Sequence, residues 1–242
     1  MSRTLELRRK RQEELRHVLW ANSDRLLPRY NTLRRALKQC GASGAWWTCE
    51  ANRRGPVYFL PTVEWVQALA DFTNELRVKR VLEVGAGDGF LARSLKSARQ
   101  DLQVFASDSG AWEKLSARTT KQERLRWRNH ELAGLKLGDT VHRMDAVAAV
   151  KHAAPDLTIV CWAPPGNLVE RVIANTSGWV LEIRTTGLEC GSLSARRFAH
   201  QVIDGPLLDF ALCRLDGDRR RKRPASQLIL YRRTSAKKAI TL

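Results

Sequence analysis

The 242-residue sequence lacks the features that would place it among membrane, secreted or zinc-binding proteins. No apolar run approaches 18 residues, so we expect no membrane-spanning helix. The first residues are charged and surround no apolar centre, which argues against a secretory signal. The five cysteines are scattered, form no Cys-x-x-Cys pair and have no accompanying histidine cluster, so we expect no metal site.

The cysteine count also bears on the compartment. An odd number of cysteines in a chain without a secretory signal favours a reducing environment, and we expect an intracellular, cytoplasmic protein. A mitochondrial location stays open because residues 3–20 form a basic amphipathic pattern, although their glutamates are unusual in transit peptides. A nuclear location stays open because residues 219–223 are five consecutive basic residues.

Acidic residues are too few to balance the basic ones. The chain has 42 Lys and Arg against 25 Asp and Glu, which gives a net charge of +17. The net charge is +7 in residues 1–40, +4 in residues 118–130 and +8 in residues 214–242, whereas the rest of the chain has a net charge of −2. A near-neutral body with basic extremities indicates contact with a polyanion such as RNA, and general solubility is the alternative.

Among the features that are present, a glycine-rich stretch at residues 81–91 organises the chain. Residues 81–84 are an apolar run with one acid, Glu83, and predict a buried strand. The turn that follows contains Gly85, Ala86, Gly87 and Gly89. A strand, a glycine loop and a helix in this order bring backbone N–H groups close to a nucleotide-like ligand. The third glycine comes one residue too early for the Gly-x-Gly-x-x-Gly pyrophosphate fingerprint.

This stretch, Glu-Val-Gly-Ala-Gly-Asp-Gly, resembles the first motif of the class I S-adenosylmethionine (SAM)-dependent methyltransferases. The resemblance implies a three-layer, Rossmann-like α/β fold whose seven-stranded sheet ends in an antiparallel pair. It implies SAM as the cofactor, with Glu83 and the glycine loop near its amino-acid end. We expect a basic helical extension at residues 1–55, a methyltransferase domain at 56–233 and a disordered tail at 234–242.

Acidic residues follow the next two predicted strands. Residues 102–108 form an apolar run that ends in Asp108, 23 residues after Gly85, where a carboxylate can accept hydrogen bonds from a ribose diol. The resemblance implies that Asp108, with Ser109 beside it, binds the SAM ribose; a solvated acid is the alternative. It also implies that Asp145 and the backbone of Ala146 contact the adenine, although Asp145 would equally serve as a helix N-cap.

A Pro-Pro loop follows the fourth predicted strand, residues 157–161. Open α/β sheets bind ligands at the carboxyl ends of their strands, so we expect Trp162, Pro164 and Pro165 near the transferable methyl group. The loop resembles a degenerate form of the Asn/Asp/Ser-Pro-Pro-aromatic motif of amino-group methyltransferases, in which Ala163 replaces the polar residue and Gly166 the aromatic one. The catalytic residue is therefore left unknown. Cys161 is expected to be an inert core thiol rather than a nucleophile.

The remaining segments flank this pattern. Helices are predicted at residues 3–20, at residues 26–37 behind a cap at 22–24, and at 63–76, with a break at 41–55. By the resemblance, Tyr58 or Phe59 contacts SAM, and a role confined to the core is the alternative. Residues 112–134 are basic, and three interpretations stay open for them: a mobile insertion, a nucleic-acid-facing arm or an irregular crossover helix.

The C-terminal quarter predicts a strand at residues 178–183, a helix at 194–202 and a hairpin of residues 207–214 with 227–232. The hairpin tip carries basic residues for which phosphate contact is the expected function. These residues are Arg219, Arg220, Arg221, Lys222 and Arg223.

Three functions fit the sequence. The first is a SAM-dependent methyltransferase acting on RNA or a ribonucleoprotein, which the basic extremities favour. The second is a methyltransferase acting on a small molecule or a protein. The third is a methyltransferase-like fold that binds nucleic acid without catalysis; the glycine loop, Asp108 and Asp145 together argue against it.

Overall fold

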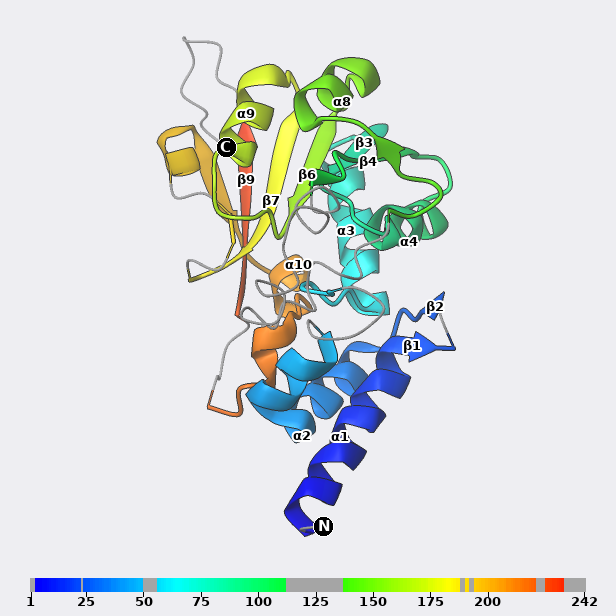
Figure 1. Ribbon diagram of the computed structural model, residues 1–242. Helices are drawn as coiled ribbons and strands as arrows, with labels where there is room; N and C mark the ends of the chain where they lie inside the picture. Colours follow the sequence, from blue (N-terminus) through cyan, green and yellow to red (C-terminus); the bar gives the residue numbers. More distant parts are fainter. Residues whose placement is uncertain are drawn as a thin grey trace.

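The computed structural model describes residues 3–22, 24–49, 56–111, 137–187, 190–191, 194–220 and 225–232. A sheet covered by helices forms the larger part, and the helices α1 and α2 lie at one end of it (Figure 1). Among the described residues, no helix is both long and apolar enough to cross a membrane.

The central sheet has seven strands within the described residues, in the order β5-β4-β3-β6-β7-β9-β8. Their bounds are β3 Arg80–Val84, β4 Gln103–Asp108, β5 His142–Arg143, β6 Leu157–Cys161, β7 Trp179–Thr185, β8 His200–Ile203 and β9 Ser226–Arg232. The strands from β5 to β7 are parallel, and β9 is antiparallel to both of its neighbours. The predicted α/β fold is confirmed: this order, with its reversed last strand, is that of the class I methyltransferase fold.

Alternating residues of β3 divide the core into two layers, because successive side chains of a strand point to opposite faces. The helices are α3 Val63–Glu75, α4 Phe90–Ala98, α8 Ala146–Ala153 and α9 Leu168–Asn175. Val81 belongs to a buried cluster with Leu69 of α3, whereas Leu82 belongs to a second cluster with Val150 and Val172 of α8 and α9. Helices on both faces explain why every residue of β3 after Arg80 is buried.

The prediction for the closing hairpin is wrong in its first strand. Residues 207–209 lie in a short helix, α10 Pro206–Asp209, and the strand that pairs with β9 is β8. The predicted helix at 194–202 contains a 3₁₀ turn, η1 Ser194–Arg197, followed by the start of β8. Gly205, with φ 74°, and Pro206 at the first helical position set the boundary between β8 and α10. Pairing with β9 overrides the local helical preference.

The N-terminal helices are α1 Arg3–Leu19 and α2 Tyr30–Cys49. Between them, β1 Trp20–Ala21 and β2 Asp24–Arg25 form a short antiparallel hairpin, so the predicted helix cap at 22–24 is wrong. The predicted break after Gly41 is a kink at that residue, with φ 76°, and the helix continues to Cys49. Leu15 and Leu37 are buried in a cluster that also contains Leu212, which ties both helices to the C-terminal part of the chain.

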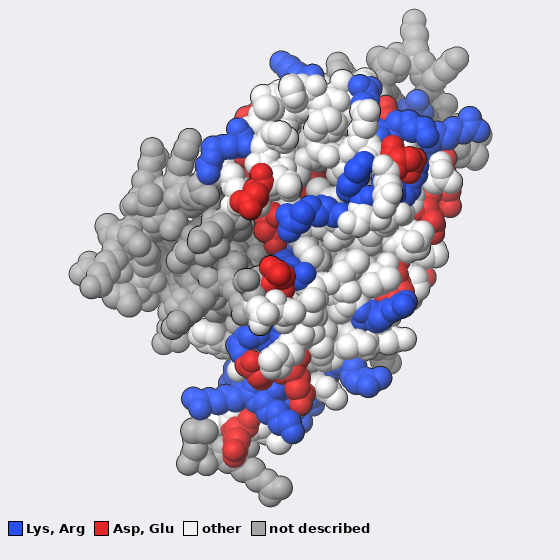
Figure 2. Space-filling model, turned by 90° about the vertical axis from the view of Figure 1, so that its right-hand side faces the viewer, with Lys and Arg blue, Asp and Glu red and all other residues white. Residues whose placement is uncertain are grey.

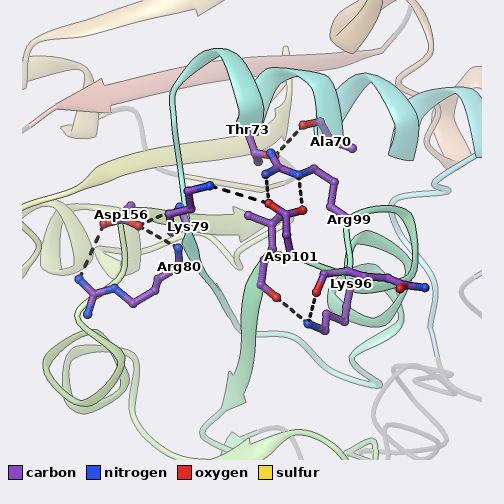
Figure 3. A network of polar contacts seen from close by, with 10 residues as sticks. Ala70, Thr73, Lys79, Arg80, Lys96, Arg99, Asp101 and Asp156 are labelled. Carbon is purple, nitrogen blue, oxygen red and sulfur yellow. Dashed lines mark hydrogen bonds and ion pairs between the residues drawn. The ribbon is translucent and has the colours of Figure 1, made fainter.

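A polar network ties the amino ends of the central strands (Figure 3). Asp156, just before β6, accepts hydrogen bonds from the backbone N–H groups of Lys79 and Arg80 at 2.9 and 2.8 Å. Arg99 donates to Asp101 and to Thr73. Structural contacts thus occupy the amino ends of these strands. A ligand would have to bind at their carboxyl ends.

Candidate active site

A cavity of about 1130 Å³ lies at the carboxyl ends of β3, β4 and β6. Its lining includes the glycine loop, Asp108 and the Pro-Pro loop. The strands that follow β3 in sequence lie on both sides of it: β4 and β5 on one side and β6 and β7 on the other. Open α/β sheets bind ligands at such a switch point, so the cavity occupies the expected place.

The glycine loop needs its glycines for two different reasons. Gly85 and Gly87 have φ of 67° and 55°, and a Cβ atom on either would meet nothing within 4 Å. Their requirement is conformational, and the space beside them is open. Gly89, with φ 68°, would in addition place a Cβ atom 2.7 Å from Val141 Cγ2. The loop therefore exposes backbone rather than side chains to the cavity.

Glu83, at the end of β3, lines the cavity and is 5% exposed. Its Oε2 accepts a hydrogen bond from the backbone N–H of Ala92 in α4 at 2.9 Å. Burial raises the pKa of Glu83 to about 8, against the opposing effect of that hydrogen bond. A carboxyl group with a pKa this close to neutral pH loses its proton readily when a cation binds beside it.

Asp108 lies beside the glycine loop at the end of β4 and is buried. Its two carboxylate oxygens accept hydrogen bonds from the backbone N–H groups of Gly87, at 3.1 Å, and Gly110, at 2.8 Å. Each oxygen has further acceptor capacity toward the cavity, as two ribose hydroxyls would need. Ser109 is exposed and accepts from the N–H of Ala111, and it does not line the cavity.

Asp145 and Ala146 do not line the cavity. Asp145 caps α8 by accepting from the N–H of Val147 at 2.9 Å, and Arg171 of α9 donates to both of its oxygens. Burial alone would raise the pKa of Asp145, but these hydrogen bonds lower it below its ordinary value. The N-cap alternative is the one that the structure contains, and the adenine contact stays a prediction.

Trp162 forms the wall of the cavity next to β6. Its φ of 52° is unusual for a residue with a side chain, and its N–H donates to the carbonyl of Ile183 at 2.9 Å. Its ring stacks on Tyr58, with centroids 5.4 Å apart and planes 11° apart. Its indole Nε1 is buried without a hydrogen-bond partner among the described residues. Such strain concentrates at functional sites.

The other residues predicted for the substrate pocket also line the cavity. Pro164 and Pro165 are exposed at its rim. Phe59 is buried against Trp65, with ring centroids 4.7 Å apart, and so serves the core as well. Cys161 faces the cavity too, and burial, with a contribution from Glu83, raises the pKa of its thiol well above the ordinary value. A protonated thiol is a poor nucleophile, but Cys161 is half-buried and lines the cavity, so it is not the core thiol that was expected.

Arg25 and Gly138 are among the residues of the cavity lining that the sequence did not predict. Arg25, from β2, donates from Nη1 to both carboxylate oxygens of Asp88 and lies 4.0 Å from the centre of the Phe90 ring. Gly138 donates from its N–H to the carbonyl of Gly87 at 3.2 Å. Both residues are far from the loop in sequence, and no local pattern marks them.

Of the predicted nucleic-acid contacts, the two that the structure describes, Arg219 and Arg220, do not line the cavity. Arg219 donates to the backbone carbonyls of Lys38 and Gln39 in α2, at 2.8 and 3.0 Å. Arg220 is exposed and pairs with Asp218. Arg221, Lys222 and Arg223 lie outside the described residues, as do residues 112–134 and the tail at 234–242.

Comparisons with known proteins add structural matches alone. No family model matches the sequence, and no curated protein matches it. A SAM-dependent O-methyltransferase from Thermotoga maritima is 14% identical with a TM-score of 0.42, over 73% of this chain and 68% of that one. An O-methyltransferase family protein from Burkholderia thailandensis is 11% identical with a TM-score of 0.41, over 96% and 71%. Because these TM-scores lie below 0.5, the fold rests on the strand order described above.

Proposed function

We propose that this protein is a SAM-dependent methyltransferase that holds its cofactor in the cavity at the carboxyl edge of the sheet. The observation that carries the proposal is the placement of two buried carboxyl groups, Glu83 and Asp108, at the ends of adjacent strands on either side of a glycine loop. Both carboxyl groups line the cavity and can accept further hydrogen bonds from a ligand there.

The residues of the cavity suit the parts of SAM. The ribose hydroxyls are donors that fit Asp108, and the cationic amino group fits Glu83, which would lose its proton on pairing with it. The open space beside Gly85 and Gly87 admits a ligand close to the backbone. When bound, SAM supplies a methyl group on a positively charged sulfur. The roles of Ser109, Asp145 and Ala146 in cofactor binding remain predictions.

The acceptor would enter beside Trp162 and the two prolines. Trp162 and Tyr58 form a flat aromatic wall there, and Pro164 and Pro165 line the rim. Ala163 is apolar and buried, and the Cys161 thiol is protonated, so neither is suited to remove a proton from the acceptor. Methyl transfer would then depend mainly on aligning the acceptor and excluding water, which can lower a barrier substantially without a strong base.

We propose RNA or a ribonucleoprotein as the substrate. The support is the charge distribution, in which a near-neutral body carries basic extremities. A small molecule or protein is the second candidate, favoured because Trp20 and Arg25 of the N-terminal segment help to enclose the cavity. The cavity of about 1130 Å³ exceeds the roughly 300–1,000 Å³ of a typical single-ligand pocket, which suits a cofactor together with an acceptor.

Isothermal titration with SAM tests the cofactor, and tritium transfer from labelled SAM into total RNA tests the substrate. We expect SAM binding in the wild type and at least tenfold weaker binding in Asp108→Asn, which loses a charged acceptor. Asp101→Asn, at the other end of β4, is the matched control and should bind normally. If the wild type does not bind SAM, the proposal is wrong, and RNA binding without SAM binding would favour the non-catalytic alternative.

A steep loss of activity with salt separates RNA from a small-molecule substrate. Binding to RNA phosphates releases counterions and weakens strongly as salt increases, whereas turnover of an uncharged small molecule does not.

A further inference from the structure

A shallow, open surface hollow of about 350 Å³ lies on α2, and it shares no lining residue with the cavity. Its lining consists of Asn31, Arg34, Arg35 and Lys38 and includes no acidic residue. These positions follow the spacing i, i+3, i+4 and i+7, which places them on one face of the helix. The opposite face of α2 is buried through Leu33 and Leu37. Core packing therefore explains the apolar residues of that face, but it does not explain the basic residues of the exposed face.

Within the described residues, no acidic side chain pairs with the two arginines of the hollow. Both Arg34 and Arg35 are exposed. Arg34 lies over the Tyr30 ring, with 5.9 Å between the guanidinium carbon and the ring centre. The face in Figure 2 shows positive and negative side chains intermixed, both over the sheet and at the lower end of the molecule.

The C-terminal basic segment meets this same helix. Lys38 Nζ donates to the carbonyl of Asp218 at 2.7 Å, and Arg219 donates back to the carbonyls of Lys38 and Gln39. In Figure 1 the segment around η2 Arg214–Gly217 lies beside α2. The described parts of the two basic extremities are therefore joined, and Arg219 extends the positive surface beyond the hollow, whereas Arg220 pairs with Asp218.

We propose that the hollow formed by Asn31, Arg34, Arg35 and Lys38 binds the phosphodiester backbone of an RNA substrate. Planar guanidinium groups suit phosphate oxygens, and the amide of Asn31 adds a donor without charge. Like charges clustered on one helix face repel one another, and a bound polyanion removes that repulsion. The inference rests on the proposed function for its choice of RNA, while the hollow itself is separate from the cofactor cavity.

Fluorescence anisotropy of a short labelled single-stranded RNA, measured over a range of salt concentrations, tests the inference. Arg34→Gln/Arg35→Gln should bind at least tenfold more weakly and reduce the slope of log affinity against log salt by about 1.4, because each lost phosphate contact contributes about 0.7. The matched control is Lys151→Gln/Arg197→Gln, which removes the same charge from exposed positions elsewhere. It should leave affinity and slope almost unchanged.

Arg34→Lys/Arg35→Lys is the control for a folding defect. It keeps both charges and should therefore keep the slope of log affinity against log salt. The inference is wrong if the hollow and control variants lose affinity equally, if neither loses affinity, or if the wild type binds phosphatidylserine vesicles and not RNA. Titration with SAM is a separate measurement. A failure of the wild type to bind SAM would overturn the proposed function and leave the RNA result standing, whereas normal SAM binding in the hollow variant confirms that its cavity is intact.

Discussion

Arg25 Nη1 lies 3.1 and 3.0 Å from the two carboxylate oxygens of Asp88, across 63 residues of sequence. Asp88 belongs to the glycine loop, and its Oδ1 also accepts from the N–H of Phe90 at the start of α4. The Arg25 side chain is 18% exposed. The N-terminal hairpin thus holds the loop that the cofactor is expected to contact.

We expect Arg25→Ala to weaken SAM binding by a factor of about 1.4 to 5, because a partly exposed ion pair contributes about 0.2–1 kcal/mol. Isothermal titration measures the change. Arg29→Ala is the control: Arg29 is 73% exposed, and its pairing distance to Glu64 is 3.9 Å. Equal effects of the two substitutions would contradict a specific role for Arg25.

Glu83 should make SAM binding dependent on pH. Its pKa of about 8 means that the free protein holds a neutral carboxyl group at neutral pH, and this group must ionise to pair with a cationic amine. Affinity should therefore rise as the pH increases toward about 8 and then level off. Glu83→Gln should bind at least tenfold more weakly and lose this dependence. A wild-type affinity that is flat from about pH 6 to about pH 8.5 would exclude the role.

The same group affects stability with a definite sign. The pKa of Glu83 is higher in the folded protein, about 8, than the ordinary value of 4.5, so the folded state binds more protons between these values. The contribution of Glu83 to the free energy of unfolding is therefore highest below about pH 4.5 and decreases as the pH rises toward about 8. Urea denaturation at several pH values should show a smaller decrease in Glu83→Gln than in the wild type.

Gly138 packs against the glycine loop so closely that no side chain fits. A Cβ atom there would lie 2.2 Å from the carbonyl oxygen of Asp88, which is backbone and cannot rotate away. Gly138→Ala should lower the free energy of unfolding by about 1–3 kcal/mol and weaken SAM binding as well. Gly44→Ala is the control, since its close neighbour is the Cys40 side chain and its position is helical. Similar losses of stability in both variants would contradict the argument.

Tyr58 and Trp162 should be energetically coupled. Their rings are stacked at 5.4 Å, and such pairs contribute about 0.5–1.5 kcal/mol beyond the area that they bury. A double-mutant cycle of Tyr58→Ala and Trp162→Ala, followed by urea denaturation, should give a coupling in this range. Additive effects would show that the two rings form no interacting wall.

The centre of the sheet and part of the site could be predicted from sequence because the signals there are local. The apolar run before the glycines predicts β3, and the spacing from Gly85 brings Asp108 to the cavity. Ser109, Asp145 and Ala146 do not line the cavity. The sequence could not predict this, because the spacing between residues does not determine the direction of a loop side chain.

Errors arose where distant contacts decide the structure. The strand β8 is mostly exposed at an edge of the sheet, and pairing with β9 makes it a strand although its own sequence does not predict one. Arg25 reaches Asp88 only because α1, α2 and the hairpin between them pack as they do. No short window of sequence contains either relationship.

The insertion of β9 between β7 and β8 has a consequence for synthesis on the ribosome. β7 and β8 emerge before β9, and β7 can already pair with β6, but the described pairing of β8 and the second pairing of β7 both require residues 226–232. Until then β7 is an exposed edge of a parallel sheet, and β8 has no sheet to join. Unpaired edges promote association between chains, so we expect the nascent protein to be prone to aggregation until β9 inserts between β7 and β8.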